Sequence, residues 1–217
     1  MEQRRRYCAV YFAENAIPTV NRTVVALRDV YAYDEKLFVW NSKKHVFYSL
    51  HANDRRRFAH SGSKKLKVMV GGIYGKGGAG PLVVFEEHEK IAAGGMAEVL
   101  QTDIGPYMTA VGMHTVMFDN AAIHNAQVTQ EVFRLLGLVR TKHPPHSPEF
   151  NPIELVWNRM QGRINRKLAL CRNITLQRLI QEIRAAWAVE ARLFLKDCQH
   201  VVECMWQALN LRGGNQY

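Results

Sequence analysis

The fold is decided by the stretch Val116-Met117-Phe118-Asp119-Asn120, in which a compact apolar run ends in an acid. A short apolar run bounded by polar residues predicts a buried β-strand. Residues 127–136 carry apolar side chains at helical spacing, and residues 138–141 predict another short strand. This alternation of strand, helix and strand is typical of an α/β domain.

Working outward, the chain before this stretch contains a run of hairpin-like strands. Strands are predicted at residues 30–35, 44–50, 65–74 and 82–85, and a helix at residues 92–108. After it, a proline-rich loop over residues 143–152 leads into a long helix from about Pro152 to Leu170, followed by an amphipathic helical tail over residues 175–209. We therefore expect an α/β fold with a mixed central sheet flanked by helices and a C-terminal helical tail.

One glycine-rich segment imitates a cofactor site. Gly75-Lys76-Gly77-Gly78-Ala79-Gly80 matches the Gly-x-Gly-x-x-Gly pattern of dinucleotide-binding sites. Such a site requires a helix to begin within the pattern, because the helix N-terminus holds the pyrophosphate. Here Pro81 and an apolar run over residues 82–85 follow, which predict another strand. We interpret the segment as a hairpin turn.

The charge balance points to a polyanionic partner. The chain of 217 residues has 29 Lys and Arg against 19 Asp and Glu, a formal net charge of +10. The excess is clustered, because residues 43–67 hold eight basic side chains and one acid, Asp54. Such clusters favour phosphate contacts with nucleic acid, although a basic protein without such a partner is the alternative.

Other classes of protein fit the sequence less well. No apolar stretch reaches 18 residues, which argues against a membrane-spanning helix, and the N-terminus shows no secretory signal. The four cysteines contain no Cys-x-x-Cys pair. We therefore expect neither a zinc knuckle nor a disulfide framework.

Three acids stand where a metal site is expected. Asp34 ends the first predicted strand, Asp119 ends the strand of the opening stretch, and Glu154 opens the long helix. Hard divalent cations prefer oxygen ligands, which carboxylates supply. Each acid has an ordinary alternative: Asp34 as a turn residue, with Asp29 or Glu35 as the relevant acid instead, and Asp119 as a helix cap. Glu154 follows Asn151 and Pro152 in a capping-box arrangement, which accounts for it without any catalytic role.

Two longer patterns carry a family resemblance. Residues 116–124, Val-Met-Phe-Asp-Asn-Ala-Ala-Ile-His, resemble the "DNAxxH" element of mariner-type DDE transposases. Residues 143–157, His-Pro-Pro-His-Ser-Pro-Glu-Phe-Asn-Pro-Ile-Glu-Leu-Val-Trp, resemble their "PPYSPxLNPIExxW" element. Asp119 and Glu154 are separated by 34 residues (154 − 119 − 1 = 34), similar to the spacing of the second and third acids in that family. Asp34-Glu35-Lys36 resembles the first-acid "DEK" element.

The resemblance implies an RNase H-like core with a catalytic triad of Asp34, Asp119 and Glu154 that binds two Mg²⁺ or Mn²⁺ ions. It implies DNA cleavage and strand transfer, with Asp34 as the ligand shared by both ions. Two cations so held activate the attacking oxygen and stabilise the leaving one. His124 is expected to touch the scissile phosphate or, equally well, to be a packed histidine at a helix cap.

The long helix has distinct faces at 100° per residue. Met160, Ile164 and Leu168 form an apolar stripe expected to pack on the sheet, with Trp157 as a core anchor at its edge. A neutral polar face near Glu154 is expected to look into the active-site groove. Together with the basic clusters, these considerations give the predicted DNA-binding residues: Lys43, Lys44, Arg55, Arg56, Arg57, Lys64, Lys65, His124, Asn158, Arg159 and Gln161.

The chain also departs from the family pattern. Only about 30 residues precede Asp34, too few for the paired helix-turn-helix modules that the resemblance implies. His146 stands where the family usually has Tyr, and Leu37 where it often has Trp. We expect an N-terminal extension at residues 1–28, a catalytic domain at residues 29–170, and a C-terminal helical segment of the same domain at residues 171–217.

Two functions of different classes follow. The first is the metal-dependent endonuclease and strand-transfer domain of a cut-and-paste DNA transposase without its recognition modules. The second is a repurposed DNA-binding or assembly protein that keeps the fold but not the catalysis. In either case DNA is the expected partner, no membrane is involved, and the C-terminal helices would suit a homodimer. A nuclear location is expected in a eukaryote, and a cytoplasmic one otherwise.

Overall fold

The computed structural model describes residues 2–14, 29–41, 65–85, 92–141, 143–169, 171, 174–190 and 193–210. Within these ranges one five-stranded sheet forms, from β1 (Tyr31–Asn41), β2 (Lys65–Gly75), β3 (Gly78–Phe85), β4 (Thr115–Met117) and β5 (Val139–Thr141). The strands lie in the order β3-β2-β1-β4-β5. β1, β2 and β3 pair antiparallel, whereas β1–β4 and β4–β5 are parallel. The expected mixed sheet is confirmed, and the strand expected at residues 44–50 falls outside the described residues.

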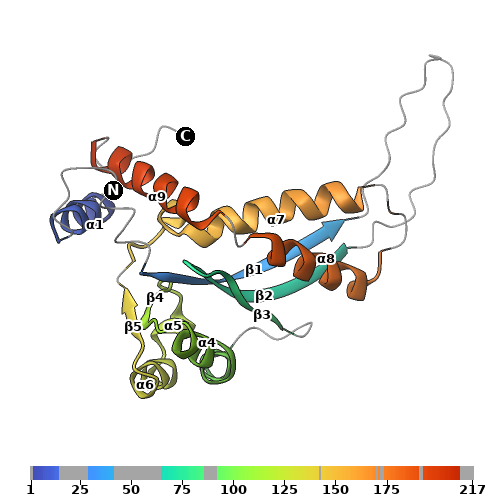
Figure 1. Cartoon of the computed structure of the whole chain (residues 1–217), viewed down its shortest axis with the longest axis horizontal. Coiled ribbons are helices and arrows are strands. Elements are labelled where there is room, and N and C mark those ends of the chain that lie inside the picture. The colour runs from blue at the N-terminus through green and yellow to red at the C-terminus, as the bar shows by residue number, and fades with distance from the viewer. Residues whose placement is uncertain are drawn as a thin grey trace, which may run out of the picture.

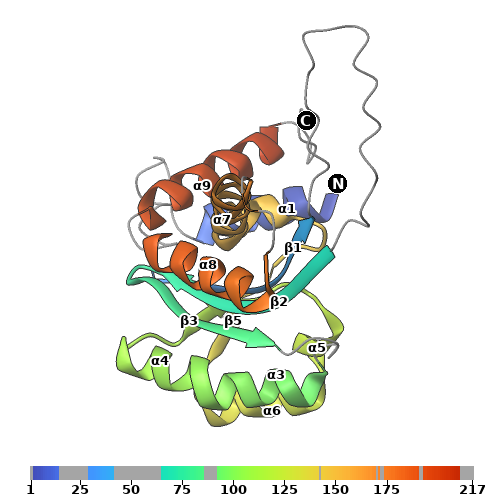
Figure 2. The same cartoon turned by 90° about the vertical axis from the view of Figure 1, so that its right-hand side faces the viewer.

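Helices cover both faces of the sheet, as Figures 1 and 2 show. On one face lie α3 (Ala93–Val99), the π-helical turn η1 (Leu100–Ile104), α4 (Gly105–Ala110), α5 (Ala122–Asn125) and α6 (Gln127–Leu135). On the other lie α7 (Pro152–Leu168), α8 (Leu176–Val189) and α9 (Phe194–Asn210), with a short 3₁₀ turn, η2 (Pro148–Phe150), just before α7. The predicted helical layers and helical C-terminal region are therefore both present.

The sheet separates two hydrophobic cores, because successive side chains of a strand point to opposite faces. On β1, Phe38 and Trp40 join the larger core beneath α7, α8 and α9. Tyr31 and Tyr33 join the smaller core with α3, η1 and α6. Since Asp34 and Lys36 have the same parity as Phe38, β1 presents them on the α7 face, and Glu35 on the other.

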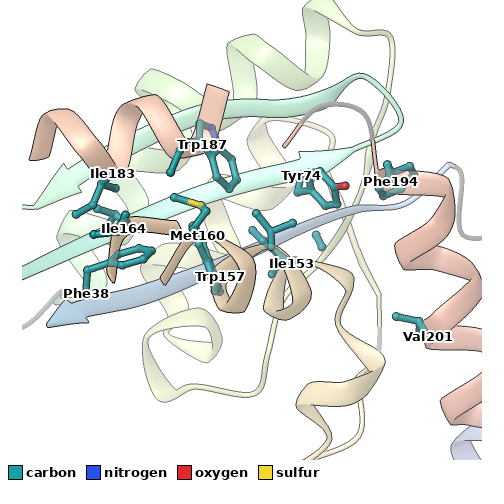
Figure 3. Close-up of a cluster of buried hydrophobic side chains, with 14 of the residues drawn as sticks. Phe38, Tyr74, Ile153, Trp157, Met160, Ile164, Ile183, Trp187, Phe194 and Val201 are labelled. Atoms are coloured by element: carbon teal, nitrogen blue, oxygen red, sulfur yellow. The ribbon is translucent and has the colours of Figure 1, made fainter. Parts of the chain in front are cut away.

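The predicted apolar stripe of α7 is buried. Met160, Ile164 and Leu168 are each at most 1% exposed, and Figure 3 shows Met160 and Ile164 within the larger core. Trp157 is fully buried and stacks on Trp187, with ring centroids 5.1 Å apart and planes inclined by 23°. The prediction that Trp157 is a core anchor is confirmed.

The glycine-rich segment is a hairpin turn, as predicted. β2 ends at Gly75, β3 begins at Gly78, and these two residues pair across the hairpin. Gly78 has a φ of 91°, in the left-handed region that favours glycine. The segment therefore supplies a tight turn and begins no helix, which excludes a dinucleotide site of this type here.

A helix that the sequence interpretation missed lies at the N-terminus. Within the predicted N-terminal extension, residues 1–28, α1 (Glu2–Glu14) forms and packs against α9. Cys8 is fully buried in the larger core, and the Phe12 ring meets the Trp206 ring edge-on at 5.6 Å. Figure 1 shows α1 beside α9, so this helix belongs to the packed domain.

A buried ion network joins α7 to the C-terminal helices. The Arg159 guanidinium donates to Glu190 at 2.7 Å and to both carboxylate oxygens of Asp197, at 2.7 and 2.8 Å. The Tyr74 hydroxyl donates to Asp197 at 2.9 Å, and Arg163 contacts Glu190 at 3.3 Å. Glu190 is fully buried and Asp197 is 4% exposed, so both negative charges depend on these partners.

No helix in the described ranges is both long enough and apolar enough to cross a membrane. All four cysteines are free, with Cys8, Cys198 and Cys204 buried and Cys171 exposed.

Candidate active site

Two of the predicted acids lie at the same end of a parallel strand pair. β1 pairs with β4 at Tyr31 and Ala32, opposite Val116 and Met117. Asp34 follows two residues later on β1, and Asp119 follows Met117 by two residues. Because parallel strands end at the same edge of a sheet, both acids reach one edge, beside the part of β1 that β4 leaves unpaired. Helix α7, which begins at Pro152 and carries Glu154 in its first turn, packs on β1.

Asp34 is held in a buried position on the α7 face. The Trp157 indole Nε1 donates a hydrogen bond to Asp34 Oδ2 at 3.1 Å, and the side chain is 9% exposed. Burial raises the pKa of Asp34 to about 8, aided by the negative charges of Glu154, Glu35 and Asp119. These acids therefore act on one another electrostatically, although their positions span 120 residues of sequence (154 − 34 = 120).

Asp119 is held by the turn that follows β4. Its Oδ1 accepts from the backbone N–H of Ala121 at 2.9 Å and lies 2.6 Å from His124 Nδ1. The hydrogen bond from His124 holds the pKa of Asp119 below its usual value. The other ring nitrogen of His124, Nε2, lies 3.0 Å from Glu35 Oε1.

His124 is buried and lies between the carboxylates of Asp119 and Glu35. Burial alone would lower its pKa, but the hydrogen bonds to Asp119 and Glu35 raise that pKa to about 9. The side chain is fully buried and both ring nitrogens have carboxylate partners. Burial and these two contacts favour the alternative of a packed histidine, and the DNA contact of His124 stays an untested prediction.

Arg140 is a site residue that the sequence interpretation missed. From β5 its guanidinium donates to the backbone oxygen of Asp119, to the His124 carbonyl at 3.2 Å and to Asn125 Oδ1 at 2.7 Å. These bonds fix the turn that carries Asp119. The position was recognisable only from strand register, because Arg140 pairs with Val116 across β4 and β5.

The loop before α7 links the second acid to the third. Asn120 Nδ2 donates to the His143 carbonyl at 2.6 Å, at the start of the proline-rich loop. From the other side, α1 braces the same loop: Arg4 pairs with Glu149 and lies 5.3 Å from the centre of the Phe150 ring. The turn that carries Asp119 is therefore joined to the start of α7, which carries Glu154, through this loop as well as through the sheet.

The Glu154 carboxylate does not accept the hydrogen bond that a capping box would give it. Asn151 is the N-cap as predicted, since its Oδ1 accepts from Ile153 N at 3.3 Å. However, the Asn151 N–H that a capping box would direct to Glu154 donates instead to the Pro148 carbonyl at 2.9 Å. The Glu154 carboxylate lies 3.7 Å from Lys36 Nζ. The capping alternative for this acid is therefore not supported.

The donor set suits a hard divalent cation, because it consists of carboxylate oxygens. In the described ranges, however, no three Asp, Glu, His or Cys side chains already converge as the ligands of one ion. Each acid has another partner, namely the Trp157 indole, His124 or Lys36. The assignment of the triad as metal ligands stays a prediction.

Apart from His124, the predicted DNA-binding residues fall into three groups. Those outside the described residues are Lys43, Lys44, Arg55, Arg56, Arg57 and Lys64. Lys65 on β2 and Asn158 on α7 are exposed, and Gln161 is partly exposed with its amide bonded to Asn165 at 3.0 Å. The Arg159 guanidinium is engaged by Glu190 and Asp197, and its predicted DNA contact stays untested.

The fold of the chain is similar to that of solved transposase structures. Structures of Mos1 transposase cover the whole chain. Its paired-end complex with the left transposon end has a TM-score of 0.79 at 14% identity, and its isolated catalytic domain a TM-score of 0.69 at 14% identity. The chain spans 63% of the first of these and 95% of the second. They support an RNase H-like fold for this chain.

A structure of the Mos1 catalytic domain with a bound small molecule and metal is also similar to this chain. The Mos1 catalytic domain with raltegravir and Mg is matched with a TM-score of 0.66 at 12% identity, over 96% of that chain. No curated protein sequence matches the chain. A family model described as DDE superfamily endonuclease matches residues 29–177, more than half of the chain. The chain belongs to the DDE superfamily endonuclease family.

Proposed function

We propose that the chain is the catalytic domain of a DNA transposase, which cleaves DNA phosphodiester bonds and joins the ends to new DNA. The observation that carries this proposal is the placement of Asp34 and Asp119 at one sheet edge, with α7 and its first-turn Glu154 packed on β1, in a DDE-family fold. The pKa of Asp34, raised by burial and by the charges of the other acids, supports their proximity. The structures of Mos1 with DNA ends, Mg or Mn add support by analogy.

Asp34, Asp119 and Glu154 would hold two Mg²⁺ or Mn²⁺ ions, with Asp34 shared. When bound, such ions would activate the attacking oxygen and stabilise the leaving oxygen. The protein's own contribution is orientation. The Trp157 indole fixes one oxygen of Asp34, and His124 and Arg140 fix the turn that carries Asp119. DNA is the proposed substrate, and the net charge of +10 favours its approach.

Replacing Asp119 with asparagine tests this function. The amide keeps an oxygen for the Ala121 N–H but removes the charge that a divalent cation needs. We expect Mn²⁺-dependent nicking of supercoiled plasmid to fall by roughly a hundredfold or more. Glu98→Gln, a similar charge loss on the exposed side of α3, should nick at the wild-type rate.

Chelation of the metal should abolish nicking by the wild type. Wild-type protein that binds DNA but nicks none with either metal would argue for the second function, a DNA-binding or assembly protein without catalysis. Equal nicking by Asp119→Asn and wild type would remove Asp119 from the site.

A further inference from the structure

Lys36 contacts Glu154, one of the three acids predicted to bind metal. Its Nζ is 3.7 Å from Glu154 Oε2, and β1 presents it two residues beyond Asp34 on the same face of the sheet. The two side chains are 31% and 30% exposed, so solvent and ions reach the pair. The contact joins β1, which carries Asp34, to α7, which carries Glu154, across 118 positions of sequence (154 − 36 = 118).

At this edge of the sheet, the acids contact different basic side chains among the described residues. His124 serves Asp119 and Glu35, and Arg140 donates to backbone and amide oxygens around Asp119. Lys36 is the cation in contact with Glu154. The negative charges of the acids repel one another, and Lys36 offsets part of that repulsion at Glu154. If the Lys36 charge is removed, Glu154 should therefore bind another cation more strongly.

We propose that Lys36 is a built-in counter-ion of the acid cluster, which holds Glu154 in the absence of metal and is displaced when a divalent cation binds. The inference rests on the proposed function, because it requires a metal ion at Glu154. Lys36 is a positioning residue in this scheme: it acts through Glu154, and its ammonium lowers the affinity of the site for metal.

The test is the affinity for Mn²⁺ measured by isothermal titration calorimetry without DNA. Lys36→Met keeps most of the apolar stem and removes the charge. It should lower the Kd for Mn²⁺ by roughly threefold to tenfold, the range expected for losing one competing charge at a partly exposed pair. The Mn²⁺ concentration giving half-maximal nicking should fall in parallel. Lys36→Arg keeps a cation at this position and should stay within about twofold of wild type.

Lys67→Met is the matched control, because it makes the same change on the neighbouring strand. Lys67 is exposed and pairs with Val39, so β2 presents it on the opposite face of the sheet from Lys36. Screening by salt should keep its effect on the Kd below about 1.5-fold. Melting curves of both variants would show that each is folded.

The outcomes separate the two proposals. Weaker Mn²⁺ binding by Lys36→Met, or a change no larger than that of Lys67→Met, would overturn the counter-ion role and leave the proposed function standing. Failure of the folded wild type to bind Mn²⁺ at all would overturn both. A lowered Kd confined to Lys36→Met supports the counter-ion role even if plasmid nicking proves slow.

Discussion

Glu154→Gln should nick DNA roughly a hundredfold or more slowly than wild type while melting at nearly the same temperature. The substitution keeps the size of the side chain and removes the negative charge a divalent cation needs. Stability should change by less than about 0.5 kcal/mol, because the Glu154 carboxylate makes only a partly exposed contact with Lys36. Plasmid nicking with Mn²⁺ and thermal unfolding would measure the two effects on the same preparation.

Asn151→Ala is the complementary variant. It removes the side-chain oxygen that accepts from Ile153 N and should cost about 1 kcal/mol of stability, while the acid itself remains. Cleavage should therefore fall far less than in Glu154→Gln. If Glu154→Gln cleaves normally, the acid has no catalytic role, and its position at the start of α7 is only structural.

Arg159→Ala should produce the largest loss of stability, about 3–5 kcal/mol, the range for breaking a buried ion pair from one side. The change leaves Asp197 with the Tyr74 hydroxyl and Glu190 with the longer contact to Arg163. Both carboxylates are buried, so each loses its closest cationic partner in a poorly hydrated environment. Urea unfolding followed by circular dichroism would give the free energy of unfolding.

Arg166→Ala provides the control, since Arg166 is exposed near the end of the same helix. Its effect should stay within about 0.5 kcal/mol. A loss below about 1 kcal/mol in Arg159→Ala would mean that Glu190 and Asp197 are hydrated in solution, and it would favour the predicted DNA-facing role for Arg159.

Local patterns predicted the parts of the fold that local physics determines. The N-cap at Asn151, the apolar stripe from Met160 to Leu168 and the glycine hairpin each depend on residues within a few positions of one another. The missed helix α1 also had a local signal, because Tyr7, Cys8, Tyr11 and Phe12 follow helical spacing. Its arginine-rich start and the weak separation of polar and apolar faces obscured that signal.

The fine structure of the site depends on contacts between distant segments. Glu35 meets His124 across 89 positions, and Trp157 meets Asp34 across 123. Sequence spacing does not determine which ring nitrogen or which oxygen is engaged, because these choices follow from the register of β1 with β4 and the docking of α7. The same limit applies to Arg159: helical periodicity gives its place on α7 but not its partners, Glu190 just after α8 and Asp197 on α9.

The hydrogen bond from Trp157 to Asp34 also gives the site an optical reporter. Indole emission depends on the charge next to the ring nitrogen, and the Trp157 N–H points directly at the carboxylate expected to bind both ions. Mg²⁺ is diamagnetic and does not itself quench fluorescence, so we expect its addition to change the intrinsic emission by altering the charge on Asp34. Trp157→Phe should remove most of that change, whereas Trp206→Phe, on the exposed side of α9, should leave it intact. Occupancy of the catalytic centre could then be followed in real time, without a label and before any bond in DNA is cut.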